Sequence, residues 1–342
     1  MAKVTTVGID LAKNVFSVHG VDEAGKVVVR KTVSRARLVE TIAKLAPCLI
    51  GMEACTGAHQ WAREFQRFDH TVRLMAPKFV VPYRKRGKND GNDAEAICEA
   101  VARPNMRFVP VKTVEQQAII ALHRVRQGYV EERTALINRI RAVLSEMGVV
   151  LPERAEVVRR EAAAAAEGLP DAVVQSVIQM REHLGLLDAR IEELDRQFNE
   201  LAKQSEAARR LMTIRGIGPI TALAIVAAVG DARAFKNGRQ FAAWLGLTPR
   251  QYSSGGKTRL GRITKRGDRY IRTLLILGAR AMLQNSTRHN DRLSAWAQSV
   301  RARRGWGKAI VAIANKNARI AWAVLAKGET FKAQPQVNAV AI

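Results

Sequence analysis

The first third of the chain alternates short β-branched apolar segments with segments whose apolar residues recur at helical spacing. The pattern predicts strands over 3–12, 14–21, 26–33, 47–54 and 70–77. It also predicts helices over 36–45 and 57–68 and a further helix that begins near Asp93. A short Gly-containing turn between the second and third strands is typical of a hairpin. The resulting order, β-β-β-α-β-α-β-α, indicates a mixed sheet flanked by helices.

The middle of the chain carries a heptad pattern. Between 173 and 201, apolar residues recur at spacings that alternate four and three. They are Val173, Val177, Met180, Leu184, Leu187, Ile191, Leu194, Phe198 and Leu201. A compatible helix covers 114–147, and "EGLP" at 167–170 breaks the helical pattern between the two. We expect an antiparallel coiled coil that is also suited to dimerisation, with a helical bundle packed on the first domain as the alternative.

The last third is predicted to be helical. A Gly-x-Gly turn in "IRGIGPITALAIVAAVG" (214–230) precedes an apolar helix. Gly216 and Gly218 could offer backbone N–H groups to a phosphate, or simply form a tight turn between helices. A Gly-, Ser- and cation-rich loop is predicted over 246–270, followed by an amphipathic helix, and the tail after about residue 330 is expected to be disordered.

These patterns predict an α/β plus α protein with four parts. We expect a mixed-sheet domain over 1–112, a coiled-coil region over 113–208, a mostly helical basic domain over 209–330 and a tail over 331–342.

Charge is distributed unevenly over these parts. The formal net charge is +25, and residues 211–342 carry 23 Lys and Arg against 4 Asp and Glu, whereas 113–210 are close to neutral. A basic first third and a basic last third favour a polyanion such as nucleic acid as partner over a membrane surface.

Cysteine spacing and apolar runs suggest a cytoplasmic protein. Cys48, Cys55 and Cys98 form no Cys-x-x-Cys pair, which is typical of free thiols in a reducing compartment. The N-terminal segment lacks a signal-peptide apolar region, and the run at 220–229 is too short to span a bilayer. We therefore expect a cytoplasmic, nucleoid-associated protein.

Four carboxylates in the first domain are the strongest candidates for chemistry. Asp10 lies in an otherwise uncharged strand, where an unpaired carboxylate costs several kcal/mol or more. Glu53 has the same position in the fourth strand, and Asp90 and Asp93 are spaced to share one face at a helix start. If the four converge, their repulsion calls for a hard divalent cation, Mg²⁺ or Mn²⁺. The alternative for Asp90 and Asp93 is helix capping and pairing with nearby cations.

At these residues the chain resembles a known family. The stretches "VGIDLAK", "GMEACTGAH", "KNDGNDAEAI", "IRGIGPITA", "FAAWLGLTPRQYSSGG" and "ITKRGDRYIRTLL" occur in order along nearly the whole chain. Together they resemble the DEDD transposases of the bridge-RNA-guided insertion-sequence recombinases, which have a ribonuclease-H/RuvC-like domain.

The resemblance implies roles for particular residues. Asp10, Glu53, Asp90 and Asp93 would be the metal ligands, and Ser254 of "YSSGG", next to Ser253, would attack a DNA phosphodiester. It also implies donor and target DNA, a structured guide RNA and a homo-oligomer, dimer or tetramer, as partners. The sequence pattern itself leads us to expect no membrane partner.

Cations and glycines beside these motifs are the expected nucleic-acid contacts. They are Arg84, Lys85, Arg86, Lys88, Gly216, Gly218, Arg250, Lys257, Arg259, Arg262, Lys265, Arg266 and Arg269.

Three other functions compete with a transposase or recombinase. A metal-dependent Holliday-junction-type nuclease would hydrolyse DNA with water and would not need Ser254. An actin-like sugar kinase or ATPase is the second alternative, because "VGIDLAKN" resembles the first phosphate loop of that superfamily. Against it, no second phosphate loop of the form Gly-x-Asp-x-Gly follows, and the charge of +25 suits a small anionic ligand poorly. A non-catalytic nucleic-acid-binding scaffold would tolerate Asp10→Asn.

Overall fold

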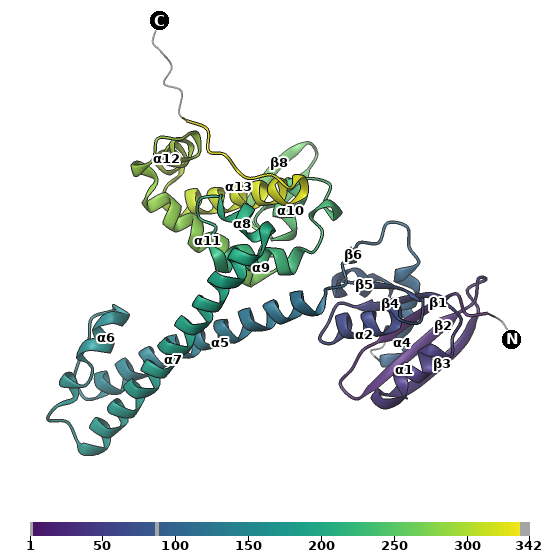
Figure 1. Ribbon diagram of the computed structural model, residues 1–342, viewed down its shortest axis with the longest axis horizontal. Coiled ribbons are helices and arrows are strands. Elements are labelled where there is room, and N and C mark those ends of the chain that lie inside the picture. Colours follow the sequence, from purple (N-terminus) through teal and green to yellow (C-terminus); the bar gives the residue numbers. More distant parts are fainter. Residues whose placement is uncertain (1–2, 86–88, 336–342) are drawn as a thin grey trace, which may run out of the picture. The chain divides into compact units, whose positions relative to one another are not determined.

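The computed structural model describes residues 3–85 and 89–335. The chain divides into two compact units, Met1–Val114 and Glu115–Ile342, which we call unit 1 and unit 2 and describe separately (Figure 1).

Unit 1 is built on a mixed sheet with the order β3-β2-β1-β4-β5-β6. The strands are β1 (Thr6–Asp10), β2 (Val15–Val21), β3 (Val27–Ser34), β4 (Leu49–Glu53), β5 (Thr71–Met75) and β6 (Phe108–Val109). β1, β4 and β5 are parallel to one another, whereas β2, β3 and β6 pair antiparallel with their neighbours. The five predicted strands and the mixed sheet are confirmed, and the two-residue β6 was not predicted.

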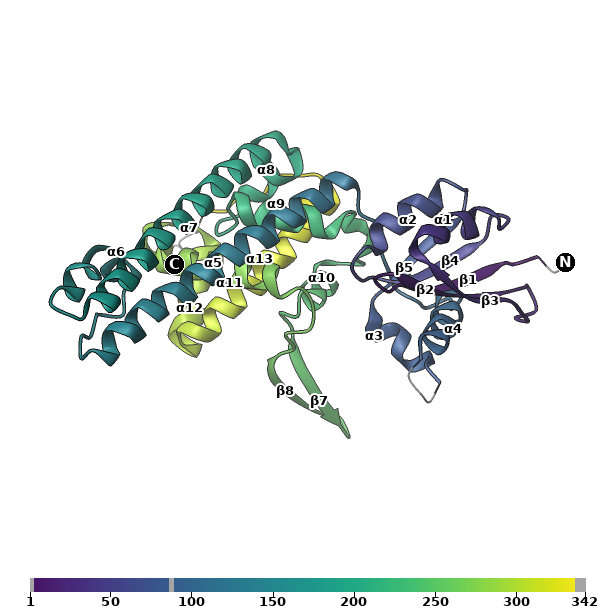
Figure 2. The same cartoon turned by 90° about the horizontal axis from the view of Figure 1, so that it is seen from below.

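Helices cover both faces of this sheet (Figure 2). They are α1 (Arg35–Ala43), α2 (Ala58–Gln66), α3 (Pro77–Val80) and α4 (Asp90–Val101). Alternate strand residues such as Val7, Ile9, Ile50 and Met52 are buried in the core with α1 and α2. α4 lies on the opposite face, so its first turn is positioned against the sheet near the ends of β1 and β4.

Two glycines let α4 approach the sheet closely. A Cβ on Gly8 would lie 2.2 Å from the carbonyl oxygen of Ala94, and one on Gly51 would lie 2.7 Å from Cβ of Val101. Neither position has room for a larger residue, because the first clash is with helix backbone and the second with a buried branched side chain.

Unit 2 begins with two long helices, α5 (Val114–Glu146) and α7 (Asp171–Gln204), joined through α6 (Ala155–Glu161). Arg126 of α5 donates to Asp195 of α7 at 3.1 Å, and Arg133 of α5 donates to Asp188 at 3.1 Å. Because the partner numbers fall as the α5 numbers rise, the helices run antiparallel, side by side (Figure 1). The helices occur where they were predicted, with the predicted break between them. Their classification as a coiled coil stays a prediction.

The rest of unit 2 is a helical domain with one hairpin. Its helices are α8 (Glu206–Met212), α9 (Pro219–Val229), α10 (Gly238–Trp244), α11 (Arg269–Gln284), α12 (Arg292–Arg304) and α13 (Trp306–Lys327). Leu194 and Phe198 of α7 belong to the same hydrophobic core as α9, α11 and α13.

α13 is the central helix of this core. Within 3–85 and 89–335 it is the one helix whose length and composition would suit a membrane span. It packs against α10, α11 and α12 and buries residues along its length, including Ile310, Ile313, Asn317 and Ala321. This placement is that of a core helix in a helical domain.

The segment predicted as a loop over 246–270 contains a β-hairpin, so that prediction was wrong. β7 (Pro249–Ser254) pairs antiparallel with β8 (Lys257–Ile263), and Gly255 and Gly256 form the two-residue turn. Both glycines have positive φ, 55° and 74°, as a type I′ turn requires.

The tail prediction was also wrong for residues 331–335. The backbone N–H of Phe331 donates to Oγ1 of Thr213 at 2.9 Å, and the backbone N–H of Arg292 donates to the carbonyl of Gln334 at 3.0 Å. Residues 336–342, the rest of the predicted tail, lie outside the described residues.

His123 gives unit 2 a predicted pH dependence. Its ring stacks on Phe198 with 4.2 Å between centroids, lies 3.0 Å from the Tyr270 hydroxyl, and its pKa is lowered by burial from 6.5 to about 4. The unfolded chain therefore binds a proton here that the folded chain does not. Stability should be full above pH 6.5 and fall by up to about 3 kcal/mol as the pH drops to about 4.

His123→Phe should flatten that loss, as measured by urea unfolding followed through the helix signal between pH 7 and pH 4. The matched control is His289→Phe at an exposed position, which should keep the wild-type slope. An unchanged slope in His123→Phe would mean that another group causes the acid sensitivity.

Candidate active site

Two acidic residues end neighbouring parallel strands. β1 and β4 pair with Ile9 opposite Met52, so Asp10 and Glu53, one residue further, lie side by side at the same edge of the sheet. Each lies two residues after one of the glycines that face α4, so both side chains are on the α4 face. Asp10 and Glu53 are thus adjacent on one face, as the sequence argument required.

The first turn of α4 contributes the other two carboxylates. The Asn89 side chain accepts from the backbone N–H of Asn92 at 2.8 Å and caps the helix, which begins at Asp90 rather than near Asp93. Negative charge is favoured in a first turn. Asp93 is buried and Asp90 is exposed, so the helix start carries one inner and one outer carboxylate.

The electrostatics of Asp10 show that these groups are close. Its pKa is raised from 3.8 to about 6, first by burial and then by the negative charges of Asp93, Asp90 and Glu53. The positive charge of Arg84 acts in the opposite direction. Negative charge is therefore concentrated at this edge of the sheet, and nearby positive charge offsets only part of it.

That counter-ion is Arg84. Its Nη2 lies 3.0 Å from Oε1 of Glu53, and its Nε lies 3.0 Å from Oδ1 of Asp93. One guanidinium thus bridges a strand carboxylate and a helix carboxylate. The neighbouring Lys85 pairs with Glu95 of the same helix. Both cations were predicted as nucleic-acid contacts. In this structure each pairs with an acid, and their contact with nucleic acid stays a prediction. Arg86 and Lys88 lie outside the described residues.

The donor set suits a hard divalent ion, although its present arrangement does not enclose one. In the part of the chain that the structure describes, no three acidic, His or Cys side chains are placed to hold one ion together. The four groups are nevertheless all carboxylates, the ligand type that Mg²⁺ and Mn²⁺ prefer. A guanidinium lies between two of them, which marks a position where positive charge is stabilised.

Ser254 lies in unit 2 at the tip of the β7–β8 hairpin, which projects from the helices of that unit (Figure 2). It is exposed and pairs with Lys257 across the hairpin, and Tyr252 pairs with Arg259. Because alternate strand residues share a face, Ser254 lies on the same face as Tyr252 and both cations. Ser253 lies on the other face opposite Thr258, and its Oγ accepts from Nε2 of Gln251 at 2.9 Å.

The predicted cations of the hairpin region are all exposed. They are Arg250, Lys257, Arg259, Arg262, Lys265, Arg266 and Arg269. Among the described residues, none of them lies within 4.0 Å of a carboxylate oxygen, so their charges remain available to a polyanion.

The Gly-x-Gly turn has a packing role at its first glycine. Gly216 has φ 88°, and a Cβ there would lie 2.7 Å from the carbonyl oxygen of Gly278 in α11. This supports a tight turn between helices. A Cβ on Gly218 would meet nothing within 4 Å, and phosphate binding by either glycine stays a prediction.

A repeated three-residue pattern in the sequence marks the strand ends of this site. Both strands end in Gly, an apolar residue and an acid, as "GID" (8–10) and "GME" (51–53). The glycine leaves room for α4 to pack closely on the sheet, and the acid two residues later lies on the same face of the sheet. The repeated pattern therefore predicts both the helix contact and the carboxylate pair.

Comparisons with known proteins agree with this organisation. Residues 7–149 match a DEDD transposase model of IS110, and residues 208–295 match a model described as Transposase IS116/IS110/IS902 family. The first match covers the four carboxylates and the second covers the Ser254 hairpin. The mixed sheet of unit 1 is consistent with a ribonuclease-H-like DEDD domain, and such a domain suggests divalent metal use.

Relatives match over almost the whole chain. A Pseudomonas aeruginosa protein described as "Probable family 20 transposase" is 48% identical over 334 residues, covering 96% of this chain and 99% of its own. The transposase for insertion sequence element IS1328 of Yersinia enterocolitica is 42% identical, covering 97% of this chain and 99% of its own. The transposase for IS1111A of Coxiella burnetii is also 42% identical, covering 97% and 92%. The chain therefore belongs to the IS116/IS110/IS902 family of insertion-sequence transposases.

Proposed function

We propose that this transposase cuts and exchanges DNA strands with a divalent-metal site on unit 1 and a serine nucleophile on unit 2. The observation that carries the proposal is the position of Asp10 and Glu53 on one face at neighbouring strand ends, beside the first turn of α4. The two groups of catalytic residues lie in different units, so the reaction requires the units of one chain, or of two copies, to bring them together.

Asp10, Glu53, Asp90 and Asp93 would hold Mg²⁺ or Mn²⁺. When bound, such an ion supplies positive charge that stabilises the developing charge on the oxygens of the attacked phosphate. The Arg84 guanidinium engages one oxygen of Glu53 and one of Asp93, so it would compete with the ion for both carboxylates.

Ser254 would carry the covalent step. Its Oγ forms a bond to phosphorus, the bond from phosphorus to one sugar oxygen breaks, the seryl proton passes to a base or to solvent, and the leaving sugar oxygen gains a proton. The number of phosphoester bonds is unchanged, so strands can later be rejoined by the reverse reaction without an energy source.

The face occupied by Ser254 supports it over Ser253 as the nucleophile. Lys257 and Arg259 share its face, so a phosphate approaching Ser254 meets two cations, whereas Ser253 faces away with Thr258. These cations, with Arg250 and the cations that follow β8, would hold the DNA backbone. Affinity should then fall with salt, with a slope of about 0.9 per phosphate contact.

We also propose two kinds of partner for the chain, an RNA and further copies of itself. A structured RNA would guide the choice of donor and target DNA. In a homo-oligomer, the carboxylates of one copy could act together with Ser254 of another. A junction nuclease that hydrolyses with water is the alternative reaction, and the family assignment favours transposition over it.

The test is to incubate the protein with Mg²⁺, the element-end DNA and the flanking RNA, and to look for DNA that stays attached to the protein in detergent. A Mg²⁺-dependent adduct is expected. Cut DNA without an adduct would instead favour hydrolysis.

Arg84→Gln should tighten divalent-ion binding by roughly tenfold in the absence of DNA. The reason is that metal binding must break two charge-assisted contacts of the guanidinium, which together are worth a few kcal/mol before solvation of the freed groups is counted. The measurement is titration with Mn²⁺, following free Mn²⁺ by electron paramagnetic resonance.

Lys85→Gln is the matched control, since it removes a neighbouring cation that pairs with Glu95 rather than with the four carboxylates. Its Mn²⁺ affinity should stay within about twofold of wild type. Equal or weaker Mn²⁺ binding by Arg84→Gln would show that Arg84 does not compete with the ion.

A further inference from the structure

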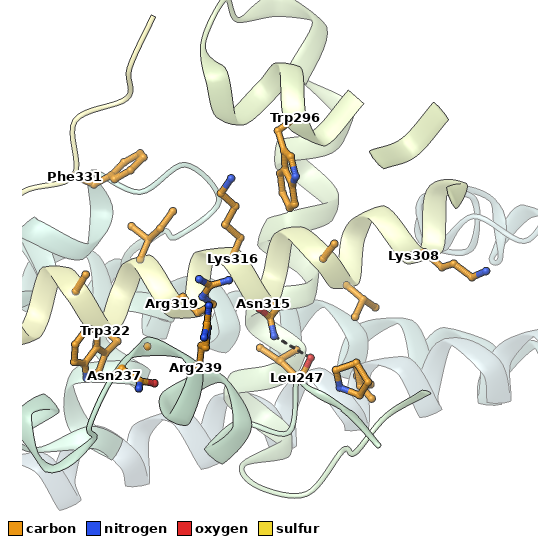
Figure 3. Close-up of a pocket in the computed structure, with 17 residues that line it drawn as sticks. Asn237, Arg239, Leu247, Trp296, Lys308, Asn315, Lys316, Arg319, Trp322 and Phe331 are labelled. Carbon is orange, nitrogen blue, oxygen red and sulfur yellow. Dashed lines mark hydrogen bonds between the residues drawn. The ribbon is translucent and has the colours of Figure 1, made fainter. Parts of the chain in front are cut away.

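A cavity of about 1160 Å³ lies in unit 2 along the outer side of α13 (Figure 3). α10, α12, the base of the β7–β8 hairpin and Phe331 complete its wall. It is several times larger than a single side chain and lies wholly within one unit. None of the catalytic or nucleic-acid-binding residues predicted from the sequence lines it.

The wall of this cavity combines four cations with aromatic rings. Arg239, Lys308, Lys316 and Arg319 line it, and no acidic residue does. Among the described residues, none of the four has a carboxylate oxygen within 4.0 Å. A half-enclosed space with only positive charge favours a ligand that brings negative charge.

Lys316 and Trp296 form the centre of this arrangement. The Lys316 ammonium lies 4.1 Å from the centroid of the Trp296 ring, and the two side chains approach each other from α13 and α12 (Figure 3). Burial and the charge of Arg319 lower the pKa of Lys316, which is the expected direction for an ammonium that lacks an anionic partner. A phosphate beside Lys316 would supply that partner, and a base could stack on Trp296.

The other aromatic and amide groups make the wall rigid. Nε1 of Trp322 donates to the carbonyl of Ala232 at 3.0 Å. Nδ2 of Asn315 donates to the carbonyl of Leu247 at 3.1 Å, just before the hairpin. These bonds connect α13 to Ala232, in the segment before α10, and to the base of the hairpin, so the wall is held in place without a ligand.

The hairpin that bears Ser254 begins and ends at this cavity. Pro249 and Ile263, the first residue of β7 and the last of β8, both line it. Ser254 lies five residues after Pro249 along the strand, a span of about 17 Å. A strand held in the cavity could therefore extend along the hairpin for several nucleotides before it reached the serine.

We infer that this cavity binds an unpaired segment of DNA, with a base on Trp296 and backbone phosphates on Lys316, Arg319 and Arg239. The inference rests on the proposed function, because cutting and exchanging strands creates unpaired ends that must be held near the nucleophile. DNA is favoured over RNA because DNA is the substrate of the family to which the chain belongs.

The test is the affinity of the full chain for a fluorescein-labelled single-stranded oligothymidylate, measured by anisotropy with a chelator present so that no cutting occurs. Trp296→Ala combined with Lys316→Gln should weaken this affinity at least tenfold and change the affinity for duplex DNA by less than threefold. Asp10→Asn should bind the oligonucleotide normally, so a failure of the metal site and a failure of this cavity give different results.

The matched control is a second Trp–cation pair in the same unit. Arg301 lies 5.0 Å from the centroid of the Trp306 ring, and neither residue lines the cavity. Trp306→Ala with Arg301→Gln should leave single-strand affinity within threefold. An equal loss in both double variants, or an equal loss for single-stranded and duplex DNA, would overturn the inference, as would a loss confined to an oligouridylate of the same length.

A conservative variant covers the case in which the double variant does not fold. Stacking of a base on Trp296 should quench indole fluorescence, and Trp296→Phe should lose most of that quenching while its melting curve matches wild type. Full quenching in Trp296→Phe would show that the base stacks elsewhere.

Discussion

Asp10→Asn should lower Mg²⁺-dependent strand cutting at pH 8 by at least about 100-fold. Loss of one ligand should weaken the binding of the divalent ion, whose stabilisation of the transition state is worth several kcal/mol. Each 1.4 kcal/mol corresponds to a factor of ten in rate. DNA affinity should stay nearly unchanged, because the predicted DNA contacts lie mainly in unit 2. The measurement is a single-turnover cutting assay beside an anisotropy titration.

The fold should survive this substitution. The charged form of Asp10 is disfavoured in the metal-free protein, as its raised pKa of about 6 indicates, so a neutral amide removes an unfavourable charge. Glu40→Gln, at an exposed position on α1, is the control and should cut normally. If Asp10→Asn cuts as fast as wild type, the chain is a binding scaffold at this site and the catalytic proposal fails.

Ser254→Ala should abolish the covalent protein–DNA adduct, because it removes the Oγ that bonds to phosphorus and the neighbouring Ser253 lies on the opposite face of the hairpin. Strand cutting should disappear with the adduct, and DNA binding should stay within a factor of two. The measurement is electrophoresis of labelled DNA in denaturing detergent.

Ser253→Ala is the matched control, since it removes the same hydroxyl from the neighbouring residue on the opposite face of the hairpin. It should retain the adduct. An adduct lost in Ser253→Ala and kept in Ser254→Ala would reverse the assignment, whereas cutting that persists in Ser254→Ala would favour the junction nuclease.

The sequence predicted the part of the site that depends on buried strands. β1 and β4 are apolar and β-branched, so an acid at the end of each stood out, and the neighbouring glycines of β1 and β4 bring α4 close enough for its first turn to join them. Strand pairing and helix capping are local enough to be inferred from residue type.

The hairpin could not be predicted in the same way. All but the last of its strand residues are exposed, so neither strand has a buried face and no apolar alternation marks it. The remaining signal was the Gly255–Gly256 pair, whose positive φ angles suit a two-residue turn.

Side-chain partners were also out of reach. Arg84 was assigned to nucleic acid because it begins a basic run, but its contacts with Glu53 and Asp93 depend on how η1 (Val81–Tyr83) places it against α4. The Trp296–Lys316 pair joins two helices through tertiary packing alone, so no spacing in the sequence marks it.

The most direct test of the metal site is the anomalous scattering of Mn²⁺ in crystals of the protein grown with the ion. We predict Mn²⁺ bound by the four carboxylates at the edge of the unit 1 sheet, with Arg84 moved away from Glu53 and Asp93. A crystal saturated with Mn²⁺ in which Arg84 still bridges Glu53 and Asp93, with the ion bound elsewhere, would contradict the account.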